Sequence, residues 1–250
     1  MYFNDVHILY YLILFIAGLF VGLFIDWANT RLPEYKKVIS LDFFKQYKKV
    51  FKPNYILVLL IPIIFIGLLY RFGIQKTLIA NLDLIKYLIL TPMLISAFII
   101  DYKLKIIPNR LTLTMFEVGL VFTFLYGLSN VAISINMILG MLAGSGIFLL
   151  ITLLGGLAYG KEAMGLGDVK LMGALGLYFG LSNIIVIALI SFLIGAIISI
   201  ILLATKIKGA SEYIPFGPFI VIAAFISMVI PFDILLNILL NIFTLGLYKR

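Results

Sequence analysis

The 250-residue chain contains no cysteine and only one histidine, one tryptophan and a small share of charged residues. Without cysteine it cannot form disulfides, bind a metal through thiolates or use a cysteine nucleophile. The one histidine, His7, precedes the first long apolar run, which argues against a histidine metal cluster and a Ser-His-Asp triad. These absences leave aspartate as the main candidate for catalytic chemistry.

Charged residues make up 12% of the chain and hydrophobic residues 64%. Soluble domains are about half apolar and about a quarter charged, so this composition predicts an all-α, polytopic transmembrane helix bundle. A hydrocarbon core of ~30 Å takes about 20 apolar residues in a helix. The candidate spans are residues 8–26, 54–71, 84–101, 111–128, 132–154, 166–181, 183–205, 216–231 and 233–247. The last run is either a ninth span or an interfacial helix, so we expect about eight or nine spans.

The net charge of +8 could indicate a nucleic-acid partner, but we do not expect one. In a membrane protein, an excess of lysine and arginine on the cytoplasmic side is the better explanation, and it predicts the topology. With the N-terminus outside and nine alternating spans, 16 of the 19 lysines and arginines fall on the inside. If the last run does not span, Lys249 and Arg250 leave the count, and 14 of the remaining 17 lysines and arginines are still inside. This bias is typical of the positive-inside rule. We therefore expect a multi-pass protein of the inner (cytoplasmic) membrane whose N-terminus lies outside. The lipid bilayer is then a partner.

The chain shows no linker, low-complexity tract or convincing repeat, which predicts a single membrane domain over residues 1–250. Its largest hydrophilic stretch is a short basic cytoplasmic loop at 31–53. Apolar residues recur there at three-residue spacing between lysines: Leu41, Phe44, Tyr47 and Val50. This spacing predicts an amphipathic helix on the inner leaflet, and a solvated basic loop is the alternative.

Two aspartates, Asp101 and Asp168, lie at the edges of apolar runs and, in the predicted topology, both at the cytoplasmic face. A carboxylate near hydrocarbon is costly, although Asp is also a common helix cap. Pro108 prevents the helix after Asp101 from continuing, and Gly165 and Gly167 allow close backbone approach beside Asp168. Two carboxylates held close together do not both ionise easily, so one stays protonated as an acid while the other acts as a base on water.

Small residues follow Asp168 near one helix face: Gly173, Ala174, Gly176 and Gly180. Such a face allows tight contact between helices. It also motivates the hypothesis that a substrate helix enters from the lipid beside this face.

Four segments, in chain order, resemble motifs of the type IV prepilin peptidases, the GxGD-type (A24-like) aspartyl proteases of the membrane. Asp101 precedes a basic turn that ends in Pro108-Asn109. Asp168 lies in a segment that runs from Glu162 to Lys170. The other two segments are an early stretch that ends in Arg31-Leu32-Pro33 and a late Ile214-Pro215-Phe216-Gly217-Pro218.

The resemblance implies an aspartic endopeptidase with Asp101 and Asp168 as its catalytic pair, a core at about 84–231 and no cofactor for proteolysis. It implies cleavage of the basic leader of type IV prepilins or pseudopilins, the substrates of pilus and protein-secretion systems, at the cytoplasmic face. Supporting or substrate-binding roles would fall to Gly165, Gly167, Lys103, Pro108, Asn109, Glu162, Lys170, Pro215 and Gly217. Ordinary loop charge is the alternative for Glu162 and Lys170, and a shaped turn is the alternative for Pro215 and Gly217.

The chain departs from the family pattern in the region of a second activity. Many bacterial members hold a four-cysteine zinc site in the first cytoplasmic loop and methylate the new N-terminus with S-adenosylmethionine. This chain has no cysteine, so we expect no structural zinc and no other metal, and Asp26 stands where the family usually has Asn. If N-methyltransferase activity and its cofactor are retained, the candidate region is Asp26, Asn29, Arg31 and Pro33. Helix-end polarity is the alternative for these residues.

Two other functional classes remain open at this point. A proton- or cation-coupled secondary transporter would also place acids in membrane helices, but transporters usually show inverted repeats and acids near mid-membrane. A non-enzymatic pilus-assembly scaffold would tolerate Asp→Asn at both Asp101 and Asp168.

Overall fold

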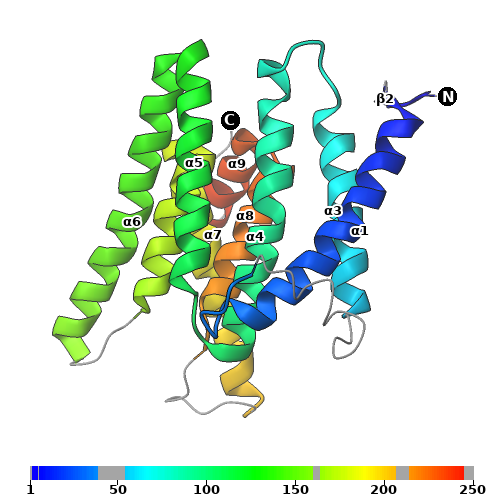
Figure 1. Cartoon of the computed structure of the whole chain (residues 1–250). Coiled ribbons are helices and arrows are strands. Elements are labelled where there is room, and N and C mark those ends of the chain that lie inside the picture. Colours follow the sequence, from blue (N-terminus) through cyan, green and yellow to red (C-terminus); the bar gives the residue numbers. More distant parts are fainter. Residues whose placement is uncertain (1, 5, 39–53, 160–163, 207–213, 245–250) are drawn as a thin grey trace. The chain divides into compact units, whose positions relative to one another are not determined.

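The structure is a computed structural model and is almost wholly helical (Figure 1). It describes residues 2–4, 6–38, 54–159, 164–206 and 214–244. Among the described helices, six are long and apolar enough to cross a membrane, and two more are apolar but shorter. The prediction of an all-α polytopic membrane protein is therefore confirmed. The predicted amphipathic helix around Leu41 to Val50 lies outside the described residues.

The chain divides into two compact units. The first comprises Met1–Lys103 with Pro108–Leu111, and the second comprises Leu104–Ile107 with Thr112–Arg250. The expected single domain and the core at 84–231 stay predictions.

The first unit begins with two short antiparallel strands, β1 (Tyr2–Phe3) and β2 (Val6–His7), in which Tyr2 faces His7. Its helical elements are α1 (Ile8–Arg31), α3 (Tyr55–Phe72), the 3-10 turn η1 (Ile79–Asn81) and α4 (Leu82–Leu104).

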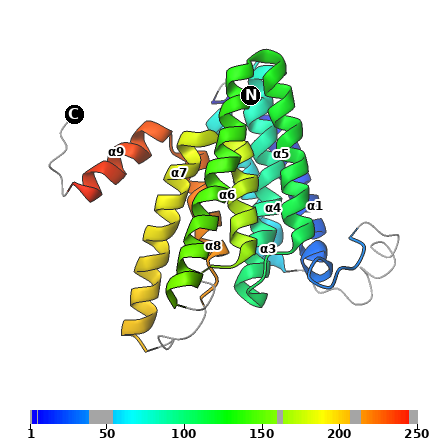
Figure 2. The same ribbon diagram turned by 90° about the vertical axis from the view of Figure 1, so that its left-hand side faces the viewer.

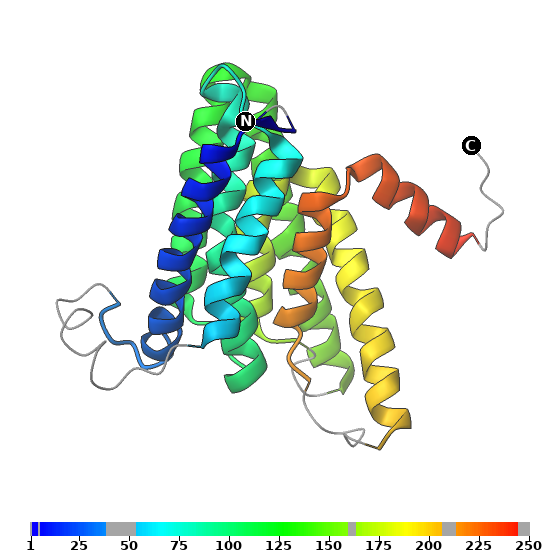
Figure 3. The ribbon, with the colours of Figure 1, turned by 90° about the vertical axis from the view of Figure 1, so that its right-hand side faces the viewer.

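Helices α1 and α3 lie side by side, as Figures 1 and 3 show. Glycine makes this contact close. A Cβ atom on Gly18 would lie 2.6 Å from the Cα atom of Pro62, and one on Gly22 would lie 2.8 Å from the Cα atom of Val58. Because no larger side chain fits at either glycine, the two backbones approach as small-residue pairs in membranes do.

The second unit contains α5 (Asn109–Ser129, from Thr112 onward), α6 (Val131–Tyr159), α7 (Leu166–Ala204), α8 (Gly217–Val229) and α9 (Phe232–Phe243). The first five predicted spans correspond to α1, α3, α4, α5 and α6, and the predicted span at 216–231 corresponds to α8.

Helix α7 reverses direction at Gly180, so its two ends lie at the same end of the second unit (Figures 1 and 2). Gly180 has φ 72° and ψ 178°, a conformation that residues with a Cβ rarely adopt. The side chain of Asn136 in α6 accepts a hydrogen bond from the Leu181 backbone N–H at 3.1 Å, in the manner of a helix cap. The two predicted spans at 166–181 and 183–205 are thus the two halves of α7.

The α6–α7 seam is the contact that Gly140 and Gly144 of α6 make with the first half of α7. A Cβ atom on Gly140 would lie 2.6 Å from the carbonyl oxygen of Gly176, and one on Gly144 would lie 2.5 Å from that of Met172. On the facing side, a Cβ on Gly173 would lie 3.1 Å from the Cβ of Ser145. The prediction that the small residues after Asp168 support tight helix contact is correct. The hypothesis that a substrate helix packs beside them loses its motivation, because α6 already covers that face.

Helix α9 decides between the two interpretations of the last apolar run. Its 12 residues give a length of about 18 Å at about 1.5 Å per residue, well short of the ~30 Å core. Asp233, Asn237 and Asn241 recur every four residues and form one polar stripe, while Leu235 and Leu239 are buried. This length and pattern favour an interfacial helix over a ninth span.

Candidate active site

Asp101 lies in the last turn of α4 and is only 3% exposed. The helix ends at Leu104, and Lys105 adopts a left-handed conformation with φ 58°. Pro108 is buried and directly precedes α5, where its carbonyl accepts a hydrogen bond from the Leu111 N–H at 3.0 Å. The chain therefore breaks between the two helices where the proline predicts a break.

Asp168 is the third residue of α7 and is 4% exposed. The residue at the helix N-cap is Gly165, whose carbonyl accepts a hydrogen bond from the Asp168 N–H at 3.0 Å. Asp168 is therefore not the N-cap residue that the simpler interpretation expects. The positive end of the helix dipole favours a carboxylate in this first turn.

Gly167 allows the turn after α4 to approach the start of α7. A Cβ atom on Gly167 would lie 3.1 Å from the Cβ of Ile107 and 3.6 Å from its backbone nitrogen. Both residues belong to the second unit. The glycine next to Asp168 thus allows a close contact with Ile107, which follows Asp101 by six positions.

The two aspartates belong to different units, Asp101 to the first and Asp168 to the second. Each is buried at a helix end, and their action as a pair stays a prediction.

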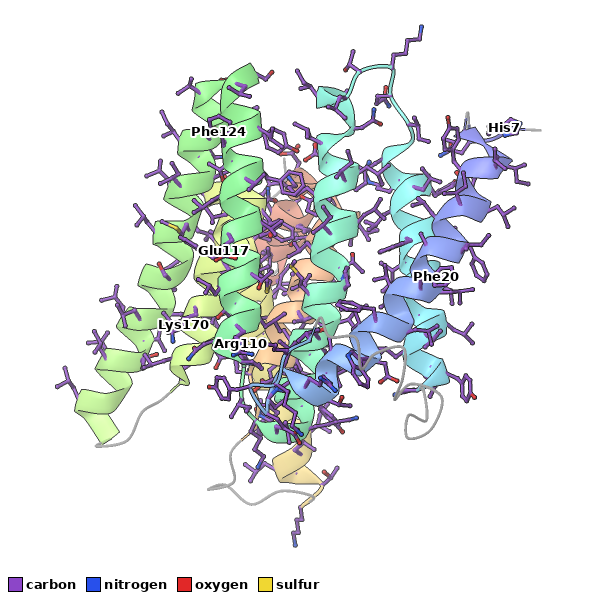
Figure 4. The ribbon with its side chains drawn as sticks, viewed as in Figure 1. His7, Phe20, Arg110, Glu117, Phe124 and Lys170 are labelled. Atoms are coloured by element: carbon purple, nitrogen blue, oxygen red, sulfur yellow. The ribbon has the colours of Figure 1, made fainter. Side chains whose placement is uncertain are left out.

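The other residues expected at the site fall into two groups. The polar ones, Lys103, Asn109 and Lys170, are exposed, and Figure 4 marks Lys170 near the start of α7. Pro215 and Gly217 are buried. Glu162 lies outside the described residues.

The motif around Pro215 and Gly217 starts helix α8, and its aromatic member was missed by the sequence interpretation. Phe216 is the N-cap residue of α8, and its carbonyl accepts a hydrogen bond from the Phe219 N–H at 3.0 Å. Its ring centroid lies 5.9 Å from Phe148 and 5.2 Å from Phe192. The motif thus anchors α8 on α6 and α7, and the roles of Pro215 and Gly217 in substrate binding or in shaping a turn stay predictions.

The early motif folds the loop after α1 back onto that helix. The guanidinium of Arg31 lies 4.1 Å from the ring centroid of Trp27 and donates a hydrogen bond to the Lys37 carbonyl at 2.9 Å. The indole N–H of Trp27 donates to the Val38 carbonyl at 3.2 Å. Asp26 accepts a hydrogen bond from the Asn54 N–H at 2.7 Å, next to the start of α3.

The same loop is held by Arg110, at the start of α5, which the motifs did not single out. Its guanidinium donates to the carbonyls of Tyr35 at 2.9 Å and Lys36 at 3.2 Å. Beside it, the hydrogen bond and positive charge of Lys36 lower the pKa of the exposed Glu34 carboxyl. No local sequence pattern predicts the two hydrogen bonds of Arg110, because their acceptors lie 75 and 74 residues away in the chain.

Binding of S-adenosylmethionine at the early motif stays a prediction, because residues 39–53 of the adjoining loop lie outside the described part of the chain. That cofactor presents an adenine, ribose hydroxyls and a cationic sulfonium, which need several polar partners. Here Asp26 and Arg31 bond to the chain itself, and Asn29 alone has buried amide atoms with no hydrogen-bond partner among the described residues. Among the same residues, no group of three or more His, Asp or Glu is arranged to hold a metal.

Comparisons with known proteins add an independent line of support. Residues 88–200 match the model of the type IV leader peptidase family. A protein named "Prepilin leader peptidase/N-methyltransferase" from Aeromonas hydrophila is 32% identical over 156 residues, which cover 62% of this chain and 53% of that protein.

Similar proteins with the same name occur in other bacteria. The Xanthomonas campestris pv. campestris protein is 36% identical over 141 residues, covering 56% of this chain and 47% of its own length. The Neisseria gonorrhoeae protein is 33% identical over 139 residues, covering 56% and 46%. The chain thus spans about half the length of the curated relatives it matches. No solved structure gives a significant match.

The matched segment contains both Asp101 and Asp168, together with the Pro108-Asn109 turn and the Gly165–Asp168 stretch. The match bears out, over residues 88–200, the resemblance inferred from the motifs.

Proposed function

We propose that this protein is a membrane aspartic endopeptidase that removes the basic leader of type IV prepilins or pseudopilins. One observation carries the proposal. The segment that matches the leader peptidase family holds two carboxylates, Asp101 and Asp168, that are 3% and 4% exposed at the ends of membrane-length helices. Buried acids in such helices are costly and mark functional sites.

In the proposed reaction the two acids share one proton and titrate as a pair, so neither has a fixed role before substrate binds. The ionised carboxylate takes a proton from water, whose oxygen attacks the carbonyl carbon of the scissile peptide bond. The protonated carboxyl then gives its proton to the amide nitrogen as the C–N bond breaks. The products are a leader with a new carboxylate and a mature protein with a new amine.

Chain connectivity supports the pairing. Ile107 packs against Gly167, the neighbour of Asp168, and only six positions separate Ile107 from Asp101. A short tether of this kind limits how far the two carboxyl groups can lie from each other.

The test is co-expression with a prepilin, with cleavage followed as a gel shift. Asp101→Asn and Asp168→Asn should each abolish cleavage while the protein stays in the membrane, because the amide can neither accept a proton from water nor supply one. Asp233→Asn is the matched control: Asp233 is also in the first turn of a helix but is exposed. Cleavage that survives both substitutions would contradict the dyad.

Cleavage at the cytoplasmic face rests on the positive-inside count. The absence of native cysteine makes this directly testable. Single cysteines at the exposed Lys103 and Lys170 should react with an impermeant maleimide only after the cytoplasmic face is opened. Reaction in intact cells would reverse the proposed topology.

Methylation of the new N-terminus stays a separate prediction. The names of the relatives include N-methyltransferase, and in the described part of the early motif Asp26 and Arg31 bond to the chain itself. Mass spectrometry of the processed pilin decides it, since methylation adds the mass of one CH₂ group.

A further inference from the structure

Glu117 is an acidic residue in the middle of a membrane-length helix. It is the ninth residue of α5, which runs from Asn109 to Ser129. At about 1.5 Å per residue it lies about 12 Å from one end of the helix and about 18 Å from the other. This depth is inside a ~30 Å hydrocarbon core, where an ionisable side chain is a functional-site hypothesis by default.

Glu117 faces away from the protein core. The inner face of α5 packs on α7: the Tyr178 hydroxyl donates to the Met115 carbonyl at 2.7 Å, and a Cβ on Gly119 would lie 2.9 Å from that of Leu177. At about 100° per residue, Glu117 is on the opposite side of the helix. Its exposed apolar neighbours have 43–66% of their surface accessible: Leu113, Leu120, Val121 and Phe124. We call these four residues and Glu117 the outer face of α5.

The described residues give the Glu117 carboxylate neither a hydrogen bond nor an ion pair. The nearest cation on the same side of the helix is Arg110, seven positions earlier, and Figure 4 shows Arg110, Glu117 and Phe124 along α5. Seven residues are about 10 Å along the axis, and the Arg110 guanidinium donates to the carbonyls of the loop after α1. No basic residue of α5 therefore lies close enough to Glu117 to neutralise the charge of its carboxylate.

We propose that the outer face of α5 docks a transmembrane helix of a partner protein, and that this helix presents a basic side chain to Glu117. The four apolar residues supply the packing surface, and the carboxylate supplies charge complementarity at a defined depth. This proposal is independent of the peptidase reaction.

A second copy of this chain does not fit the same role. A two-fold contact would place Glu117 beside its own copy, so that like charges meet. An asymmetric contact would need a lysine or arginine at mid-span. In the described helices every basic residue lies within the first or last five positions: Arg31, Arg71, Lys86, Lys103, Arg110 and Lys170.

The experiment uses the full chain in phosphatidylcholine vesicles, with a donor dye on a single cysteine placed at the exposed Leu157. The probe is an acceptor-labelled Leu/Ala transmembrane peptide with one Lys at its midpoint, so that either orientation brings the ammonium near the Glu117 depth. Control peptides carry Leu or Glu at that position. Energy transfer should show the Lys peptide binding about three- to tenfold more tightly than the Leu peptide, with the Glu peptide weakest.

Two variants distinguish the contribution of the Glu117 carboxylate to binding from that of the apolar surface around it. Glu117→Leu should reduce binding of the Lys peptide to that of the Leu peptide, while Phe124→Leu, on the same face, should keep the preference for Lys. Equal binding of the Lys and Leu peptides to the unaltered chain would overturn the proposal. Energy transfer between labelled copies of the chain would also overturn the proposal if it disappears in Glu117→Leu. The outer face of α5 would then serve self-association.

Discussion

The α6–α7 seam and the outer face of α5 are both on membrane helices of the second unit, and they have opposite properties. At the seam, backbones touch through Gly140 and Gly176 and leave no room for a side chain. On the outer face, Glu117 and four large apolar residues are exposed. From the sequence, the small residues after Asp168 suggested a face where a substrate helix enters, and Glu117 was not singled out. The comparison indicates that a run of small residues marks a contact between two helices of the same chain. A carboxylate on the exposed side of a membrane helix marks a surface for another molecule.

Filling the seam should have a larger effect than the Tyr178 and Phe124 substitutions below. Gly176→Ala should lower the free energy of unfolding by about 2–3 kcal/mol, because its Cβ would collide with the Gly140 backbone, which cannot move without shifting α6. The measurement is an SDS-titration unfolding curve followed by circular dichroism. Gly146→Ala is the control on α6: its Cβ meets nothing within 4 Å, so stability should hold or rise by up to about 1 kcal/mol. Equal losses in both variants would show that the seam is not close-packed.

A smaller effect is expected on the inner face of α5. Tyr178→Phe removes the hydroxyl that donates to the Met115 carbonyl at 2.7 Å and leaves that buried acceptor without this bond. The loss in unfolding free energy should be about 1 kcal/mol, measured by the same titration. Tyr102→Phe, at an exposed position, is the control and should change nothing measurable. An unchanged midpoint for Tyr178→Phe would mean that packing alone holds α5 on α7.

The smallest effect is expected on the outer face of α5. Phe124→Ala should change the unfolding free energy by less than about 0.5 kcal/mol, because the side chain is 66% exposed. Phe122→Ala, two positions away but buried on the inner face, should cost about 3 kcal/mol. Comparable losses for the two phenylalanines would contradict the assignment of inner and outer faces.

Much of the fold could be predicted because its signals are local. Pro108 lacks an N–H and follows a basic, polar stretch, and the two together favour a break, whereas Pro62 and Pro92 lie inside α3 and α4. The run from 166 to 205 is too long for one crossing of ~30 Å. The reversal at Gly180 confirms that division. The short final run left two interpretations open, and the length of α9 together with its polar stripe favoured an interfacial helix.

The candidate site could be predicted only as far as its motifs extend. Asp101 and Asp168 stand out because carboxylates are rare in apolar helices, and both lie in the family match. The bonds of Arg110 to the loop after α1, and of Asp26 to Asn54, join residues far apart in the chain and leave no local pattern. By the same rule Glu117, in the middle of the predicted span 111–128, could have been singled out as an acid, but the sequence could not show that it lies on the exposed side. Membrane helices are apolar on all sides, so periodicity does not reveal which face packs inward.

The sequence by itself determined that this is a helical membrane protein, where most of its helices end, and which family model residues 88–200 match, because composition and short motifs are local properties. The tertiary structure decided which surfaces of those helices are used. It placed Gly140 against Gly176, buried Met115 and exposed Glu117. That choice rests on packing between helices, which depends on the shapes of residues distant in the chain.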